Sequence, residues 1–390
     1  MKKISHRKEN QFLAKKEKIM KKNDKNKKNW FDIIFYTLSA IVIIVLLFIG
    51  LRQRGWLPIF WIDEKPSSQI AAIPQEIKER RANFNIINAH EHVQSEKNIS
   101  LIRKTMKDCQ IKKMVLLGTS DFTFFLNSSY GFTGYEENNE FVIKCSQDYP
   151  DEFAALVTLD PRDENKMEKL QNYIKAGAAG VKLYNGHGSF YDLFFHMPLI
   201  DSSMMEIYSY CEKEHIPILY HINIGRFSEE FEKILKEFPQ LVIIAPHFML
   251  STNSLNRLDR FMKEYPQLYL DISFGHPDFL VSGFSRISNN YIAFHDFMVN
   301  YRDRITFGTD LVVTTYKAKN RTYIDDIHLA YMDLLEKDDF VLPSSIYNML
   351  SKDVRKNTDT TRIFKGLNLD DVTLNAIYHD NAEKLFFKDK

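Results

Sequence analysis

The chain has 390 residues, of which 44% are hydrophobic, so it can bury the core of one large domain or of two ordinary ones. The formal net charge of +1 is unevenly distributed, because residues 1–30 contain 12 Lys and Arg against 3 Asp and Glu. The remainder is mildly acidic and shows no helix-turn-helix, zinc-finger or RNA-binding signature, which argues against a nucleic-acid partner. The 3 cysteines form no CxxC pair and imply no disulfide framework.

The N-terminal region is predicted to anchor the protein in a membrane. After the basic tail, residues 31–51 form an apolar segment without charge from residue 33 onward, and a helix of this length spans roughly 30 Å. Trp30, Trp56 and Trp61 flank the segment as an aromatic belt would. The basic tail favours a cytoplasmic N-terminus, with the rest of the chain outside the cytoplasm. A cleaved signal peptide is the alternative, but no small-x-small cleavage site follows the segment.

Residues 52–84 contain several prolines and are expected to form a linker, in which a brief helix at Gln75–Arg81 is possible. From residue 85 to the end at 390, short apolar runs alternate with amphipathic helical stretches. Eight strands that alternate with helices predict an α/β fold of the (β/α)8 TIM-barrel type, which takes roughly 250 residues. A doubly wound sheet is the alternative, but its first strand usually leads into a glycine-rich turn. The predicted strands are Ile86–His90, Met114–Gly118, Ala154–Leu159, Gly180–Tyr184, Ile216–Ile222, Leu241–Pro246, Leu268–Ile272 and Ile305–Thr309.

Two further regions complete the predicted barrel. Residues 341–390 show no strand pattern and are expected to form helices packed on the barrel. The long loops over residues 119–136 and 185–200 are rich in aromatic residues. These aromatic side chains either pack against one another or line a substrate pocket, since loops that follow barrel strands surround the active site.

Residues of the kinds that bind metal ions stand at the ends of several predicted strands. His90 and His92 are two positions apart, so they point to the same side of the first strand. His221, His247 and Asp310 end the fifth, sixth and eighth strands, and these ends converge in a barrel. Three imidazoles and a carboxylate suit Zn²⁺ with an open position for water, whose pKa the metal lowers to about 7. Asp310 can both bind the metal and accept the proton of that water, while His247 can polarise a carbonyl or stabilise an oxyanion.

The order His-x-His, Lys, His, His, Asp at strand ends resembles the amidohydrolase superfamily. More narrowly, it resembles the amidohydrolase-related branch that includes aminocarboxymuconate semialdehyde decarboxylase. The resemblance implies a divalent metal held by His90, His92, His221 and Asp310, with His247 acting on the substrate. The stretches that support it are Gly177–Leu183, Tyr269–Ser273, Ile305–Asp310 and Ile377–Leu385.

The resemblance leaves the number of metal ions open. In binuclear relatives the lysine of the fourth strand, here Lys182, is carboxylated and bridges two metals, and His247 becomes a further ligand. One metal is favoured, as is usual in the decarboxylase-like branch. Tyr184 and His276 are candidates for substrate contact, as is Phe248, which stands where relatives often have glycine.

The expected function is that of a metal-dependent hydrolase, which cleaves an amide, ester or lactone of a small molecule by attack of a metal-bound hydroxide. A non-oxidative decarboxylase on the same site is the alternative, and it would be favoured by a basic residue for the substrate carboxylate, such as Arg286, Arg302 or Arg321. A non-catalytic scaffold is the third hypothesis, which metal-ligand residues at five strand ends argue against. The sequence leaves the oligomeric state open, a homo-oligomer included.

Overall fold

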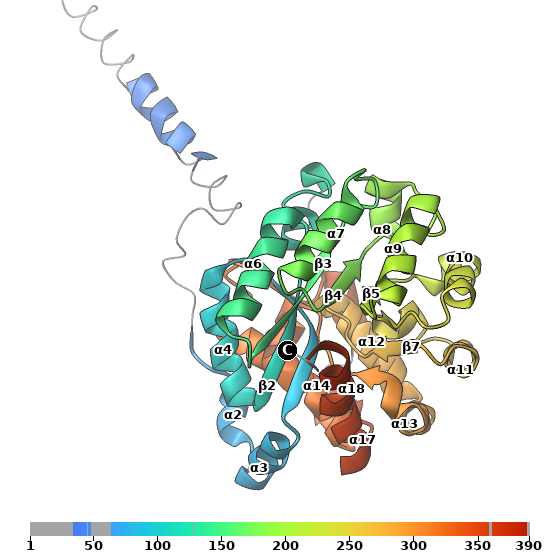
Figure 1. Cartoon of the computed structure of the whole chain (residues 1–390). Helices are drawn as coiled ribbons and strands as arrows, with labels where there is room; N and C mark the ends of the chain where they lie inside the picture. Colours follow the sequence, from blue (N-terminus) through green and yellow to red (C-terminus); the bar gives the residue numbers. More distant parts are fainter. Residues whose placement is uncertain (1–33, 45, 48–63, 127, 359–360, 388–390) are drawn as a thin grey trace, which may run out of the picture. The chain divides into compact units, whose positions relative to one another are not determined.

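The computed structural model describes residues 34–44, 46–47, 64–126, 128–358 and 361–387. The chain divides into two compact units, Met1–Phe60 and Trp61–Lys390. In the first unit, the described residues are helical. The second unit contains all described strands (Figure 1).

The predicted membrane location requires correction. Within the described part of the chain, no helix is long and apolar enough to cross a bilayer. A span needs about 20 consecutive apolar residues, whereas only residues 34–44 and 46–47 of the expected segment are described as helix. This finding overturns the predicted single-pass location with the catalytic domain outside the cytoplasm. The basic tail, the tryptophans and the other residues of the expected span lie outside the described residues.

A curled parallel sheet forms the centre of the second unit. Its strand order is β8-β7-β6-β5-β4-β3-β2-β1-β9, so neighbours in the sheet are also neighbours in the sequence except where the ring closes. This arrangement is consistent with the predicted α/β TIM barrel. The strands are β1 Ile86–Val93, β2 Ile111–Leu117, β3 Phe153–Thr158, β4 Gly180–Leu183, β5 Ile218–Tyr220, β6 Ile243–Ala245, β7 Leu268–Asp271, β8 Ile305–Thr306 and β9 Leu311–Val313.

The last predicted strand is divided into β8 and β9, and the two parts close the ring. β8 pairs with β7, whereas β9 pairs with β1. Between them, the Ala89 N–H donates to the Phe307 carbonyl and the Asp310 N–H donates to the His90 carbonyl, each at 2.8 Å. The first and last strands of the barrel are therefore joined directly beside the predicted metal ligands.

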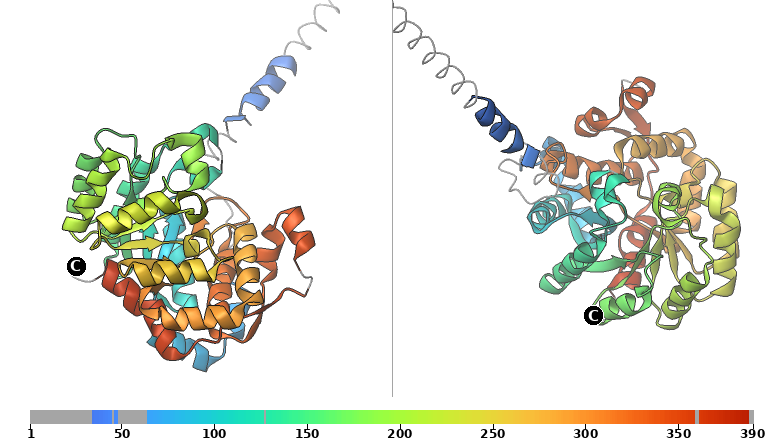
Figure 2. Two further views of the ribbon diagram at one scale, coloured as in Figure 1. Left: turned by 90° about the vertical axis from the view of Figure 1, so that its right-hand side faces the viewer. Right: turned by 90° about the horizontal axis from the view of Figure 1, so that it is seen from above.

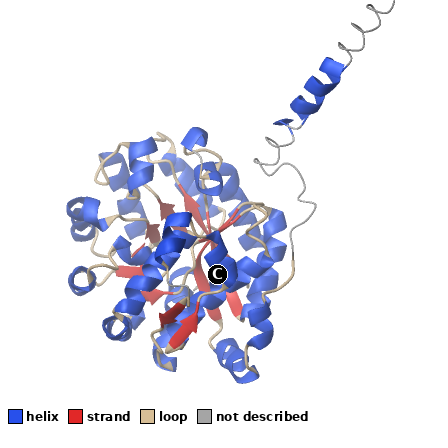
Figure 3. Cartoon of the chain, turned by 180° about the vertical axis from the view of Figure 1, so that it is seen from behind, coloured by secondary structure: helices blue, strands red, loops and turns tan. Residues whose placement is uncertain are grey.

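Helices cover the outer side of the strands, as the views from the side, from above and from behind show (Figure 2, Figure 3). Helix α4, for example, turns Ile99, Ile102 and Met106 toward the core while its charged residues face outward. The helices include α2 Ser68–Ala72, α3 Gln75–Asn83, α4 Glu96–Cys109, α5 Asp121–Phe125, α6 Tyr135–Asp148, α7 Lys166–Lys175, α8 Gly188–Phe190, α9 Ser202–Lys213, α10 Ile224–Glu237, α11 Leu255–Glu264, α12 Pro277–Asn289, α13 Tyr291–Asn300, α14 Arg321–Glu336, α15 Ser344–Met349, α16 Lys352–Asn357, α17 Asp371–Asn375 and α18 Asn381–Phe386.

The barrel interior is filled with apolar side chains, as expected of parallel strands that are buried on both faces. Phe386 of α18 packs against this interior cluster. A packed apolar layer therefore supports the strand ends that carry the polar site. The strand residues of the cluster are Ile87, Ala89, Val115, Leu117, Ala154, Leu156, Leu219, Ile244 and Tyr269.

The brief helix that the sequence allows at the end of the linker is present as α3, and it is packed, since Arg81 is buried and pairs with Glu336 at 2.9 Å. One segment departs from the predicted elements. In the C-terminal region, where only helices are predicted, β11 Ile363–Lys365 pairs antiparallel with β10 Asp339–Val341. Each of these strands buries only its central residue, so the pattern is too short for hydrophobic periodicity to reveal it.

Candidate metal centre

A β-bulge in β1 brings His90 and His92 into the barrel mouth. Asn88 and Glu91 are three positions apart on β1, whereas their partners on β2, Met114 and Leu116, are two positions apart, so the alternation of faces shifts by one. Asn88 and Glu91 consequently share a buried polar network with His328 of α14, on the outer side of the strand. The two histidine rings lie 5.3 Å apart on the inner side, as the sequence predicts.

Asp310 lies in contact with both His90 and His92. Its Oδ1 atom lies 3.0 Å from Nε2 of His90 and 3.0 Å from Nε2 of His92, and ligand atoms of the three residues lie within 4.8 Å of one another. Asp310 has a left-handed φ of 54° between β8 and β9, a conformation that costs free energy and is common at functional sites. Gly275 makes room for it, because a Cβ there would lie 2.5 Å from Asp310 Oδ2.

Hydrogen bonds behind the two rings orient them toward a common point. His90 Nδ1 donates to the Asp271 carboxylate at 2.5 Å. His92 Nδ1 donates to Thr119 Oγ1 at 2.5 Å, because that hydroxyl already donates its own proton to the Leu117 carbonyl. In neutral rings, both Nε2 lone pairs therefore face the same carboxylate oxygen. Electron-rich atoms that converge in this way repel one another unless a cation lies between them. These residues therefore fit a divalent metal.

The pKa shifts agree with a site that attracts positive charge. Burial opposes ionisation of Asp310, but His90 and His92 hold the pKa of its carboxyl well below the usual range. Burial likewise opposes protonation of His90, yet Asp310 and Asp271 together raise its pKa. Burial lowers the pKa of His92 to about 4, so that ring is neutral at pH 7 and can bind a metal.

Lys182 extends from β4 into the same site. Its Nζ lies 3.5 Å from His90 Nε2, and the side chain is only 1% exposed. Burial lowers the pKa of Lys182 to about 8, although Asp310 and Asp271 oppose the shift. Lys182 therefore lies beside the candidate metal ligands.

His221 and His247 lie beside the three converging residues. His247 Nδ1 donates to the Ser273 carbonyl at 2.7 Å, and its Nε2 lies 3.6 Å from Asp310 Oδ2. The His221 ring lies 4.7 Å from that of His247, and no group among the described residues hydrogen-bonds to its buried Nε2. A buried ring nitrogen without a partner is costly, which is what a ligand position without its metal would show. His221 does not, however, belong to the close group that His90, His92 and Asp310 form.

The turn that carries His247 is strained. Four consecutive residues, from His247 to Leu250, have φ between 51° and 58°, which costs L-residues roughly 1–2 kcal/mol each. Burial of Phe248 and Met249, which are 1% and 0% exposed, offsets this cost. The Phe248 ring packs against Phe274, Phe294 and Phe297. The predicted substrate contact through Phe248 therefore needs correction, because this side chain is part of the hydrophobic core.

The other two predicted substrate contacts differ in their exposure. Tyr184 is buried and its ring lies 6.5 Å from that of His92, but it also stacks on Phe190. Phe190 and its aromatic neighbours from the two long loops pack mainly against one another, in a cluster beside Tyr184. His276 is exposed, and its Nδ1 accepts the Asp278 N–H at the start of α12.

Several residues at the site were missed by sequence reasoning. His187 lies in the long loop over residues 185–200, and its ring lies 4.2 Å from that of His221. Asp271 ends an apolar strand in the same way as Asp310, so its position could have identified it. Lys319 lies in the loop after β9, where its Nζ donates to the Val312 carbonyl at 2.5 Å. Nothing in the sequence around Lys319 distinguishes it from a solvated lysine.

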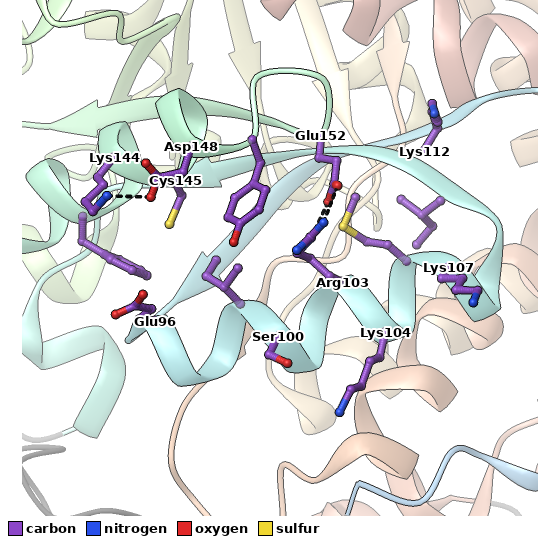
Figure 4. Close-up of a pocket in the computed structure, with 15 residues that line it drawn as sticks. Glu96, Ser100, Arg103, Lys104, Lys107, Lys112, Lys144, Cys145, Asp148 and Glu152 are labelled. Carbon is purple, nitrogen blue, oxygen red and sulfur yellow. Dashed lines mark hydrogen bonds and ion pairs between the residues drawn. The ribbon is translucent and has the colours of Figure 1, made fainter.

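A cavity of about 740 Å³ lies away from this site, between α4 and α6 (Figure 4). Its charged groups include two pairs, Arg103 with Glu152 at 2.7 Å and Lys144 with Asp148 at 2.6 Å. Burial raises the pKa of the Cys145 thiol to about 12, so this group is not a nucleophile at neutral pH. The cavity therefore does not compete with the strand ends as a site of chemistry.

Several solved structures are similar to this chain. A probable 2-pyrone-4,6-dicarboxylic acid hydrolase from Acinetobacter baumannii, with citric acid bound, has a TM-score of 0.50 and 14% identity over 77% of this chain and 98% of its own. An uncharacterised TIM-barrel protein from Bordetella bronchiseptica has a TM-score of 0.48 and 18% identity over 80% and 89%. A 5-carboxyvanillate decarboxylase from Sphingomonas paucimobilis has a TM-score of 0.43 and 12% identity over 77% and 98%. At 14% identity, the likeness to the Acinetobacter baumannii structure concerns the fold alone.

A search of curated proteins found no match. The family called Amidohydrolase matches residues 130–388, a region that begins after β1 and β2 and so includes Asp310 but not His90 or His92. The match agrees with the resemblance in the strand-end residues and suggests an enzyme. Because it spans well over half of the chain, this protein belongs to the amidohydrolase family.

Proposed function

We propose that this protein is a metal-dependent hydrolase that cleaves an amide, ester or lactone bond in a small molecule. The observation that supports the proposal is the convergence of two imidazole nitrogens on one oxygen of Asp310, each at 3.0 Å. Such a donor set suits Zn²⁺ with a position left for water or substrate.

In this proposal His90, His92 and Asp310 hold one divalent cation, and His221 completes the set. Lys182 stays unmodified in a site with one metal and stabilises negative charge beside His90. Were it carboxylated, Lys182 and His247 would serve a second metal. A bound divalent cation would lower the pKa of water to about 7 and polarise the substrate carbonyl.

Asp310 and His247 are the groups that would transfer protons during the reaction. Asp310 accepts a proton from the attacking water and returns it to the leaving group when the bond to the carbonyl carbon breaks. His247 donates through Nδ1 to the Ser273 carbonyl, so its neutral ring presents a lone pair at Nε2. Burial lowers the pKa of His247 to about 4, and the ring can therefore donate from Nε2 only after it gains a proton. Negative charge on a substrate oxygen beside Nε2 would favour that protonation.

Non-oxidative decarboxylation is the second candidate for this site. A basic group that could hold a substrate carboxylate favours it, and the Lys319 ammonium near the strand ends is such a group. The two reactions differ in their products, since only decarboxylation releases carbon dioxide.

Elemental analysis combined with turnover tests the proposal. The purified chain is expected to hold one zinc or similar cation and to hydrolyse a member of a panel of esters, lactones and amides. His90→Asn should lose the metal and the activity, whereas His295→Asn, which changes an exposed histidine of α13, should keep both. A folded His90→Asn variant with full metal content would contradict the ligand assignment. Release of carbon dioxide from an aromatic or unsaturated acid, without hydrolysis of the panel, would favour the decarboxylase.

A further inference from the structure

Lys319 occupies a defined place at the mouth of the barrel. It lies in the loop that joins β9 to α14, and its half-buried side chain turns back so that Nζ donates to the Val312 carbonyl at 2.5 Å. Val312 pairs with His92 across β9 and β1. The ammonium is therefore held beside the strand that carries two of the candidate metal ligands.

Three neighbouring groups locate the Lys319 charge relative to the site. Burial lowers the pKa of Lys319 to about 8, and the charges of Asp310 and Glu91 oppose that shift. Lys319 in turn helps burial to lower the pKa of His276, which stands in the loop after β7. The Lys319 ammonium is therefore close enough to interact electrostatically with Asp310 and with His276 in the loop after β7.

Lys319 lacks an anionic partner among the residues that the structure describes, since none of them forms an ion pair with it. A cation that is partly removed from water without such a partner is unfavourable. One of its three N–H donors is used by the Val312 carbonyl. The other two match the two oxygens of a carboxylate, to which a charged donor makes a short and strong hydrogen bond.

The arginines that the sequence offers for such a role lie elsewhere. Arg321 is buried between Asp325 at 2.5 Å and Asp108 at 2.6 Å, so its charge is already compensated. Arg286 of α12 donates to the Thr252 hydroxyl at 3.2 Å. Arg302 precedes β8, at the end of the strand opposite to Asp310, where it is partly exposed. Lys319, like Lys182, is therefore a cation near the strand ends that forms no ion pair with any residue the structure describes, and unlike Lys182 it lies outside the group of candidate metal ligands.

We propose that Lys319 binds a carboxylate of the substrate, so that the protein selects organic acids whose carboxylate stands beside the bond to be broken. The kind of bond that is broken rests on the proposed function, whereas the binding of an organic acid by Lys319 does not. The geometry that carries it is an ammonium anchored on Val312, next to the strand of His90 and His92, with two free donors.

The test compares wild-type protein with Lys319→Gln, which keeps an N–H donor for the Val312 carbonyl but removes the charge. Lys317→Gln is the matched control, because Lys317 is exposed on the same loop. Each metal-loaded protein is assayed on a pair of substrates that share the same ester or lactone and differ only by a carboxylate. Binding of succinate and benzoate is measured separately by titration calorimetry.

Lys319→Gln is expected to lower kcat/KM for the acidic substrate by about 10- to 100-fold, the usual size of one hydrogen bond to a charged group. It should change kcat/KM for the neutral substrate by less than about threefold and weaken succinate binding by a similar 10- to 100-fold. Because any carboxylate binding by the metal is common to all three proteins, the difference between them isolates Lys319.

Two outcomes would overturn the inference. One is an equal loss on the acidic and the neutral substrate, which would indicate that Lys319 only supports the loop. The other is unchanged succinate and benzoate binding in Lys319→Gln. Failure of wild-type protein to hydrolyse either substrate, together with Lys319-dependent binding of succinate, would instead reject the proposed hydrolysis and keep the acid-binding role.

Discussion

Gly275 offers the sharpest test of the geometry at Asp310. Gly275 has a φ of +67°, and a Cβ there would lie 2.5 Å from Asp310 Oδ2 and 2.8 Å from the Asp310 carbonyl oxygen. In Gly275→Ala the left-handed backbone costs roughly 1–2 kcal/mol. In addition, Asp310 must move by ~1 Å to restore ordinary contact, a displacement that can reduce catalysis by about 100-fold.

Gly177→Ala separates these two effects. Gly177 has a φ of +103°, and nothing lies within 4 Å of the Cβ that alanine would add. Both variants should therefore lose stability to a comparable degree, seen as a fall of a few degrees in Tm. Only Gly275→Ala should also lose metal during dialysis against a graded chelator and lose turnover. If Gly275→Ala kept its metal and stayed within about threefold of Gly177→Ala in kcat/KM, Asp310 would not be the ligand proposed here.

Three further predictions address neighbouring groups. Asp271→Asn removes the carboxylate that accepts from His90 Nδ1 and should weaken metal affinity by about 10- to 100-fold, measured by competition with a chelating dye. Burial lowers the pKa of His92, His187 and His247 to about 4, so between pH 6.5 and 4 the unfolded chain binds more protons than the folded chain. Tm should therefore be constant above pH 7 and fall as the pH is lowered from 6.5 to 4. A Tm that stayed constant down to pH 4 would contradict the burial of these rings. Phe248→Ala should cost about 3–5 kcal/mol of unfolding free energy, whereas lost activity at unchanged stability would restore a substrate role for this ring.

Much of the site could be predicted because it depends on strand ends. Strand periodicity places His90 and His92 on one side, and barrel geometry brings Asp310 to them from the eighth strand. The bulge at Ala89 and His90 could not be predicted, since the two-residue period alone does not show where an extra residue enters a strand. Lys319 was missed for a different reason: its position depends on how a loop folds back onto Val312, which hydrophobic patterns do not record.

The errors at the two ends of the chain have other causes. An uncharged segment indicates a membrane helix by composition, but the part of this segment that the structure describes contains no helix long and apolar enough to cross a bilayer. In the C-terminal region, Phe340 and Phe364 are the only buried residues of two strands that pair across more than 20 intervening positions. Pairing over such a distance leaves no local signal in either segment.

The division of the last strand into β8 and β9 has a consequence for the order in which the protein folds. Three of the candidate metal ligands, His90, His92 and Asp310, come from the first strand and from the junction where the ring closes. Thr309 and Glu91, which are hydrogen-bonded at this junction, are 218 positions apart in the chain. Contacts of such long range form late, because the loop entropy between them must first be overcome. During synthesis, the ligand set therefore cannot assemble until almost the whole barrel has been made, and a bound cation would fasten the first strand to the last.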